Sequence, residues 1–352
     1  MYKNTPPPKS KICLALSGGI DSTFAGWLLK QEGYELTGAY LNIIDNDKNL
    51  ANVKSTADFL GIPLEIMDLR QQFNNLIIKP FIKDYLSGQT PNPCVFCNAI
   101  IKCGILLDWA LKNGFSYLAT GHYAQIKRDP ETEKFLLLRG KDLQKDQSYF
   151  LYRLTQKQLS HLHLPLDHWT KREVEDQIKK TGFTHNKIQE SQEICFLSTK
   201  DYRIFLKEVA PDAFSPGPIY DKSGNRLGSH SGLVNYTIGQ RKGLQLVKQG
   251  PNYVLSLDPK KNSVIVGTDE DLWQSMLFAN NINRIIPEWP RKVMAKIRST
   301  QPAKEATLEE TGDPQVVKVL FSNPVRAITP GQSVVFYEEE ICLGGGIIYR
   351  AG

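Results

Sequence analysis

Two of the six cysteines have the spacing of a reactive pair. Cys94 and Cys97 follow a loop stiffened by Pro91 and Pro93, because each proline fixes one φ angle. We expect Cys97 to fall in the first turn of the next helix, where the dipole favours a thiolate, with the positive charge of Lys102 nearby. Such a thiolate suits a nucleophile or a sulfur carrier. The alternative is a structural zinc, which normally takes four ligands, more than this stretch offers on one helix face.

A glycine turn near the N-terminus is the second chemical feature. The apolar run before Ser17 predicts a buried parallel strand, and a helix from about Phe24 to Gln31 follows the sequence Ser17-Gly-Gly-Ile-Asp-Ser22. The glycines let the backbone approach a ligand closely, and the helix N-terminus favours an anion. The turn lacks the Walker lysine and the spacing of a dinucleotide-binding turn. It resembles the PP-loop of enzymes that cleave ATP between its α- and β-phosphates.

The elements that must position these residues alternate between strand and helix up to about Gly121. We expect strands at 36–41, 64–69 and 115–120, and helices at 53–60, 77–86 and 98–112. This alternation predicts an α/β fold with a parallel sheet and ligands at the carboxyl ends of its strands. From Phe135 to about Glu208 we expect mostly helix, clearest at 156–162 and 171–181.

The remainder of the chain is expected to be rich in strands. Short apolar–polar runs after Pro211 predict β-hairpins, and strands at 293–298, 306–308, 315–321, 333–337 and 347–350 predict a small closed barrel. We therefore expect three units. These are an α/β parallel-sheet domain with a helical extension (1–208), a small central α+β domain (209–280) and a C-terminal β-barrel (281–352).

Composition narrows the class of protein. The 352 residues are 41% hydrophobic and 23% charged, which is normal for a globular protein. We expect no apolar run of the roughly 18 residues that span a membrane. The polar N-terminal segment lacks the apolar core of a secretory signal, so we expect a cytoplasmic protein. The net charge of +6 is compatible with RNA binding, and six cysteines in a chain of this length do not form a disulfide scaffold.

Together the motifs resemble those of the tRNA-specific 2-thiouridylase family over nearly the whole chain. They occur in the family's order: Ser17-Gly-Gly-Ile-Asp-Ser22, Thr90-Pro-Asn-Pro, Cys97-Asn, Ala119-Thr-Gly-His-Tyr123, Lys145-Asp-Gln-Ser-Tyr-Phe-Leu151, Ile194-Cys-Phe196, Thr237-Ile-Gly-Gln-Arg-Lys-Gly-Leu244 and Thr329-Pro-Gly-Gln332. The resemblance implies a PP-loop (adenine nucleotide alpha hydrolase-like) domain, a central domain and a barrel. It also implies a sulfurtransferase that uses ATP to replace O2 of the wobble uridine of certain tRNAs with sulfur.

The resemblance further implies roles for individual residues. ATP would bind at Ala15, Leu16, Ser17, Gly18, Gly19, Ile20, Asp21, Ser22, Leu41 and Gly121, with Asp21 helping to place Mg²⁺. The target base would meet Asn92, Pro93 and Cys94, and tRNA would meet His122, Lys145, Asp146, Gln147, Arg298, Ser299 and Gln332. Cys97 matches the nucleophile and Cys195 the persulfide-bearing cysteine, although Cys195 alone looks like a core residue. A sulfur-donating relay protein or a cysteine desulfurase would supply the sulfur, and we expect a monomer.

Cys94 departs from the family pattern, because well-known members have Asp at this position. Cys94, Cys97 and Cys195 would also make three soft ligands for an Fe–S cluster. The sequence leaves the persulfide relay and the cluster open, and favours the persulfide because such clusters usually have four thiolate ligands. A non-catalytic RNA-binding module with a dead ATP pocket is a further alternative, which the intact Ser-Gly-Gly-Ile-Asp-Ser motif opposes.

Overall fold

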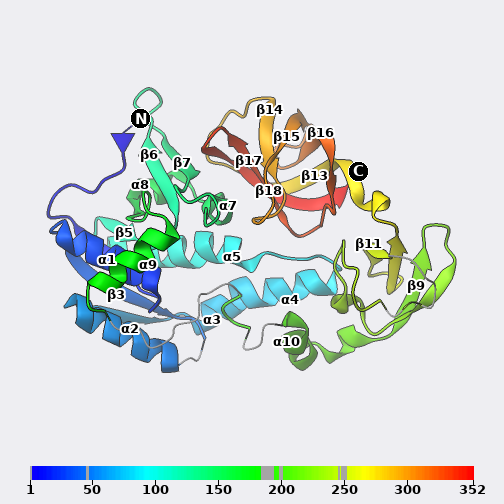
Figure 1. Ribbon diagram of the computed structural model, residues 1–352, viewed down its shortest axis with the longest axis horizontal. Coiled ribbons are helices and arrows are strands. Elements are labelled where there is room, and N and C mark those ends of the chain that lie inside the picture. The colour runs from blue at the N-terminus through cyan, green and yellow to red at the C-terminus, as the bar shows by residue number, and fades with distance from the viewer. Residues whose placement is uncertain (1, 45–46, 184–193, 198–200, 245, 247–251) are drawn as a thin grey trace.

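The computed structural model describes residues 2–44, 47–183, 194–197, 201–244, 246 and 252–352 (Figure 1). The chain passes from a parallel sheet flanked by helices, through a small central sheet, to a closed barrel (Figure 1). This succession confirms the predicted fold class.

Five parallel strands form the N-terminal sheet, in the order β4-β3-β2-β5-β8. Their bounds are β2 Lys11–Ala15, β3 Glu35–Asn42, β4 Leu64–Asp68, β5 Tyr117–Ala119 and β8 Leu162–His163. Helices α1 (Ile20–Gln31) and α2 (Asp47–Leu60) connect the first strands. The chain adds β3 and β4 on one side of β2, then returns to add β5 on the other. This reversal opens a crevice at the carboxyl ends of β2 and β5, where a ligand can bind.

Two long helical segments contain π-helical stretches. The first joins α3 (Arg70–Phe73), a π-helix (Asn74–Ile78) and α4 (Lys79–Leu86), and the second joins α5 (Pro93–Phe96), a π-helix (Cys97–Ile105) and α6 (Leu106–Lys112). The second is long and apolar enough to cross a membrane by length and composition, so the expectation of no such run was wrong. Val95, Ile101 and Leu106 are fully buried within the protein, which identifies this segment as a core helix.

A hairpin follows β5, formed by β6 (Ala124–Arg128) and β7 (Phe135–Arg139). The expectation of helix from Phe135 was therefore wrong at its start. β7 lies between β6 and β18 and is buried along its middle, and such a continuous apolar run cannot be told from a helix by periodicity. Helices follow as expected: α7 (Ser148–Leu151), α8 (Gln156–His161), α9 (Lys171–Lys180) and α10 (Tyr202–Val209).

The central unit is a four-stranded sheet in the order β10-β9-β12-β11. Its strands are β9 (Gly217–Asp221), β10 (Arg226–His230), β11 (Tyr253–Asp258) and β12 (Ser263–Gly267), with a short 3₁₀-helix at Leu233–Asn235. The buried residues Ile219, Val254 and Val264 form its core.

Six antiparallel strands form the C-terminal barrel, which closes because β18 pairs with both β13 and β17. They are β13 (Trp273–Arg284), β14 (Lys292–Lys296), β15 (Lys304–Glu310), β16 (Val317–Arg326), β17 (Ser333–Glu338) and β18 (Ile341–Ala351). β18 also pairs with β7. One core cluster contains Leu118 of the parallel sheet, Tyr149 of α7 and Val335 of the barrel, so the barrel and the N-terminal domain are packed together.

Candidate functional site

The PP-loop is a tight turn from Ser17 to Ser22, between β2 and α1. Gly18 has a φ of +74°, a left-handed conformation that favours glycine. The Ser22 hydroxyl accepts a hydrogen bond from the backbone N–H of Ser17 (3.3 Å) and donates one to the carbonyl of Gly19 (3.0 Å). Within the described residues no side chain caps the N-terminus of α1. Its first backbone N–H groups therefore suit the phosphates of a nucleotide.

Gly121, after β5, lies directly against this loop. A Cβ atom at this position would lie 2.8 Å from the carbonyl carbon of Asp21 and 2.9 Å from the nitrogen of Ser22, so the close approach requires glycine. Leu41 lies on the neighbouring strand β3 and is half-buried. The structure thus joins the loops that follow β2 and β5 at the crevice between these strands.

Asp21 is held by two side chains for which the sequence predicted no role. Its Oδ1 atom accepts hydrogen bonds from the Tyr123 hydroxyl (2.6 Å) and from Nζ of Lys171 (2.8 Å). Burial, and then the charge of Asp21, raise the pKa of Tyr123, so this phenol remains a donor. Lys171 is 150 residues from Asp21, and no local sequence signal predicts the contact.

Cys97 lies deeper in its helix than the sequence predicts. The helix begins at Pro93, with Asn92 at the N-cap, so Cys97 lies beyond the first turn. Burial raises the pKa of the Cys97 thiol, and Lys102 offsets this only in part. The half-buried Cys94 also has a pKa raised by burial. The expectation that Cys97 lies in the first turn was therefore wrong, and burial disfavours the thiolate that was expected there.

Cys195 lies in the neighbourhood of Cys97. Its neighbour Phe196 packs edge-on against Phe73 (5.8 Å between ring centres) and against the apolar cluster that contains Cys97. Cys195 is exposed by surface area, yet desolvation by the surrounding protein, followed by the charge of Cys97, raises its pKa to about 12. Both cysteines are free thiols. The fold therefore brings two thiols that are far apart in sequence within electrostatic reach of one another.

Lys102 provides the positive charge of this neighbourhood. Burial alone lowers the pKa of its amine, but the cysteine thiols, Cys97 first, raise it, and the net effect is an increase. His122 lies beside this charge, with its Nδ1 2.9 Å from the hydroxyl of Thr120. Burial, and then Lys102, lower the pKa of His122 to about 3, so its ring is neutral.

The cysteines do not form a metal site. Across the described part of the chain, no three His, Cys, Asp or Glu side chains are grouped so that they could hold a metal ion. Cys94, Cys97 and Cys195 in this arrangement do not fit an Fe–S cluster, and we derive no step through one.

The barrel holds the loop that precedes Cys94. Nε2 of Gln332 donates to the carbonyl of Thr90 (2.8 Å), and Arg298 donates to the hydroxyl of Thr329 (3.0 Å). Ser299 follows in a half-buried turn. A pocket of about 370 Å³ is lined by residues of all three units: Thr90, Thr237, Ile238, Gly239, Gln240, Arg298, Thr329 and Gln332.

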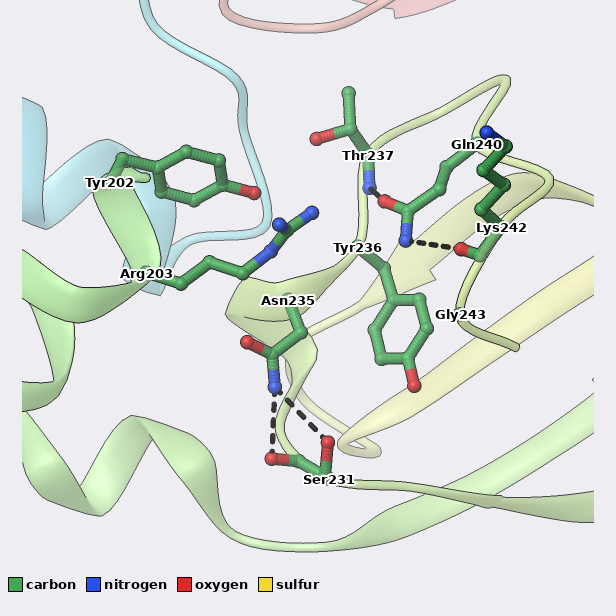
Figure 2. A pocket seen from close by; sticks show the side chains of 9 residues that line it. All are labelled: Tyr202, Arg203, Ser231, Asn235, Tyr236, Thr237, Gln240, Lys242 and Gly243. Atoms are coloured by element: carbon green, nitrogen blue, oxygen red, sulfur yellow. Dashed lines mark hydrogen bonds between the residues drawn. The ribbon is translucent and has the colours of Figure 1, made fainter. Parts of the chain in front are cut away.

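A second pocket, of about 530 Å³, shares Thr237 and Gln240 with the first. Figure 2 shows the guanidinium of Arg203 directed into the space between Tyr202 and Thr237. Tyr202 is itself stacked on Tyr85 (4.4 Å between ring centres), which fixes this wall. The full lining is Tyr202, Arg203, Ser231, Asn235, Tyr236, Thr237, Gln240, Lys242 and Gly243. Its cationic and polar side chains suit a sugar–phosphate backbone.

The segment Lys145-Asp146-Gln147 exposes only its first side chain. Asp146 is buried, and its carboxylate accepts hydrogen bonds from the backbone N–H and the hydroxyl of Ser148 (3.0 and 2.9 Å). Gln147 accepts from the backbone N–H of Tyr123 (2.9 Å). Asp146 and Gln147 therefore shape the loop, and Lys145 is the side chain that can reach a bound polyanion.

Nearly the whole chain aligns with proteins named tRNA-specific 2-thiouridylases. It is 45% identical to the tRNA-specific 2-thiouridylase MnmA 1 of Caldanaerobacter subterraneus subsp. tengcongensis, over 97% of this chain and 98% of the relative. It is 43% identical to the tRNA-specific 2-thiouridylase MnmA of Moorella thermoacetica, over 95% of this chain and 98% of the relative. This chain belongs to the tRNA-specific 2-thiouridylase family.

Domain models divide this member of the 2-thiouridylase family into three parts. They are described as a tRNA methyl transferase HUP domain (residues 10–199), a tRNA methyl transferase PRC-barrel domain (203–268) and an aminomethyltransferase beta-barrel domain (275–348). These descriptions name methyl transfer, whereas the full-length relatives are named thiouridylases. A solved 4-thiouridine synthetase–RNA complex with bound ATP is 17% identical, with a TM-score of 0.34 over 49% of this chain and 41% of that chain. This likeness is too weak to add to the assignment.

Proposed function

We propose that this protein is a tRNA-specific 2-thiouridylase, a sulfurtransferase that uses ATP to replace O2 of a wobble uridine with sulfur. The proposal rests on the neighbouring thiols of Cys97 and Cys195, in a chain of which 97% aligns with a 2-thiouridylase. A PP-loop ligase for small molecules would need no such pair. We place the enzyme in the cytoplasm as a monomer that receives sulfur from a relay protein or a cysteine desulfurase.

ATP activates the uridine. C2 is a poor electrophile because its oxygen is a poor leaving group, so O2 first attacks the α-phosphate of ATP. The bond from the α-phosphorus to the bridging oxygen breaks, and diphosphate leaves into the PP-loop, where the N–H groups of α1 stabilise its charge. Asp21 would hold the Mg²⁺ that accompanies the nucleotide and neutralises phosphate charge. O2 is then ready to leave as part of AMP.

The thiols deliver sulfur. The terminal sulfur of a persulfide on Cys195 attacks C2, and AMP departs with O2. Cys97 then gives up its thiol proton, which ends on the released nucleoside, and its sulfur attacks Sγ of Cys195, breaking the sulfur–sulfur bond of the adduct. This step releases 2-thiouridine and leaves a Cys97–Cys195 disulfide, which a cellular dithiol reduces for the next turnover.

We propose a division of tRNA binding among the three units, residues 1–208, 209–280 and 281–352. The target uridine must leave the anticodon stack to reach the thiols. The pocket at Thr90 and Gln332 suits the flipped nucleotide, next to Asn92, Pro93 and Cys94. The pocket lined by Arg203 and Lys242 suits the tRNA phosphates next to the flipped nucleotide. The affinity for tRNA should therefore fall as the salt concentration rises.

The proposal is tested with the purified protein, an unmodified tRNA transcript with uridine at the wobble position, Mg²⁺, ATP and a persulfide donor. Nucleoside mass spectrometry should find 2-thiouridine, in amounts equal to the AMP formed, and AMP should form only when tRNA is present. Formation of 4-thiouridine or 2-thiocytidine instead, or of AMP without tRNA, would overturn the proposal.

A further inference from the structure

Lys171 places a positive charge at the PP-loop from a distant part of the chain. Its Nζ lies 2.8 Å from Oδ1 of Asp21, and its side chain is only 12% exposed. It is the first residue of α9, and the preceding Trp169 packs edge-on against Phe24 of α1 (5.0 Å between ring centres). The lysine is therefore fixed beside the N-terminus of α1, where the fold offers backbone donors to an anion.

The ion pair between Lys171 and Asp21 can break, so that the ammonium of Lys171 can bind another anion. The ammonium of Lys171 loses most of its hydration, whereas the side chain of Asp21 is 35% exposed, so desolvation offsets part of the attraction within the pair. Asp21 also keeps a second donor, the hydroxyl of Tyr123 (2.6 Å), when the ammonium moves away. Lysine is a compact charge on a flexible stem, so it can turn from one oxygen to another. The segment Ser17–Ser22 itself contains no basic residue, although a triphosphate brings several negative charges to it.

We propose that Lys171 is the phosphate-binding lysine of this enzyme and contacts the β- and γ-phosphates of ATP, the diphosphate that leaves. This inference rests on the proposed use of ATP. Before nucleotide binds, Asp21 keeps the ammonium in place. On binding, Lys171 turns to the phosphates, and the carboxylate of Asp21 keeps its hydrogen bond from Tyr123. Asp21 would then be able to hold a Mg²⁺ that accompanies the nucleotide. Because AMP lacks these two phosphates, Lys171 distinguishes ATP from AMP.

The test compares nucleotide affinities of the full chain by calorimetry, with Mg²⁺ and without tRNA or a sulfur donor. Lys171→Met should weaken binding of α,β-methylene-ATP and of inorganic diphosphate by about 10- to 100-fold, the effect of losing one charge-assisted hydrogen bond. AMP affinity should change by less than about threefold. Equal losses of affinity for α,β-methylene-ATP and for AMP in Lys171→Met would show that Lys171 has a structural role only, and would overturn the inference. Unchanged affinity for both nucleotides would overturn it as well.

Matched variants control for damage to the helix. Lys141 pairs with Glu173 of the same helix α9 (2.9 Å), so Lys141→Met disturbs α9 without approaching the PP-loop and should leave both affinities unchanged. Lys171→Arg keeps the charge and should keep the preference for ATP over AMP, even if Lys171→Met folds poorly. If the wild-type protein bound ATP no more tightly than AMP, the inference would be overturned. Failure of the proposed function would appear differently, as normal ATP binding without thiolation.

Discussion

Gln332 in the barrel donates a hydrogen bond to the carbonyl of Thr90, at 2.8 Å, in the loop that leads to Cys94. The backbone at Gly331 also approaches Thr90 closely, since a Cβ added at position 331 would lie 2.8 Å from the Thr90 nitrogen. The C-terminal barrel therefore holds the loop that leads to Cys94 and Cys97.

Removal of this bond should loosen the loop. We expect Gln332→Ala to lower kcat/KM for thiolation about tenfold, by mispositioning the loop, and to reduce the free energy of unfolding by about 1 kcal/mol. Steady-state kinetics and urea denaturation measure the two effects. Gln315→Ala, at an exposed position of the same barrel, should change neither. Equal activity of both variants would show that the barrel does not position the loop.

Arg203 should contribute to the affinity for tRNA. Its guanidinium is directed into the pocket in Figure 2, so Arg203→Gln should weaken tRNA binding and reduce the slope of log K against log[salt] by about 1. Filter binding across a salt series measures the slope. Lys134 is exposed in the loop of the β6–β7 hairpin, which is drawn at the top of Figure 1 whereas α10 is drawn at the bottom, and Lys134→Gln should leave the slope unchanged. A slope that is the same for Arg203→Gln and wild type would exclude Arg203 from phosphate binding.

The reactivity of Cys97 should depend on pH in a defined direction. Its folded pKa is raised by burial, so the thiolate fraction at neutral pH is small and alkylation by iodoacetamide should still be accelerating at pH 9. Lys102 lowers this pKa, so Lys102→Met should raise it further and slow alkylation at pH 8 by about tenfold for each pKa unit gained. Peptide mass mapping follows the label at Cys97.

Lys112 near the end of the same helix provides the control for that measurement. Its side chain is exposed, so Lys112→Met should leave the alkylation rate of Cys97 unchanged. A rate for wild type that already levels off below pH 8 would contradict a raised pKa.

Cys94→Asp distinguishes the two sulfur chemistries that the sequence left open. The substitution introduces the residue that well-known family members carry there. Under the persulfide mechanism thiolation should remain within about threefold of wild type, a change below 1 kcal/mol in the barrier. Iron analysis and thiolation assays of the anaerobically purified protein measure the outcome. Loss of activity together with loss of bound iron would instead support a cluster.

Local patterns were enough to predict four of the five strands of the N-terminal sheet and most of the barrel. The fifth strand, β8, was missed because a helix was predicted over 156–162. These patterns failed where tertiary contacts determine whether a segment is a helix or a strand. β7 is a continuous apolar run because Leu136, Leu137 and Leu138 are all buried, so both faces of the strand are covered. β13 was not predicted because register shifts between Gln274 and Met276 and between Asn280 and Asn283 break the two-residue alternation.

In the candidate site, too, some residues carry a local sequence signal and others are placed only by tertiary packing. The glycines of the PP-loop and the Cys94–Cys97 spacing carry local signals, so their positions could be predicted from sequence. Lys171 carries none, because only the packing of α9 on α1 brings it to Asp21. The helix that contains Cys97 was predicted to begin at Asn98, but Pro93 can occupy its first position, which places Cys97 beyond the first turn and leaves burial to set its pKa.

Sulfur transfer through Cys195 is tested most directly by a single-turnover assay of Cys195→Ser with tRNA, ATP and a persulfide donor. We predict that 2-thiouridine formation falls at least about 1,000-fold while the Kd for tRNA stays within about twofold of wild type, because the variant loses the sulfur carrier and no tRNA contact. Formation of 2-thiouridine by this variant at the wild-type rate would contradict the mechanism.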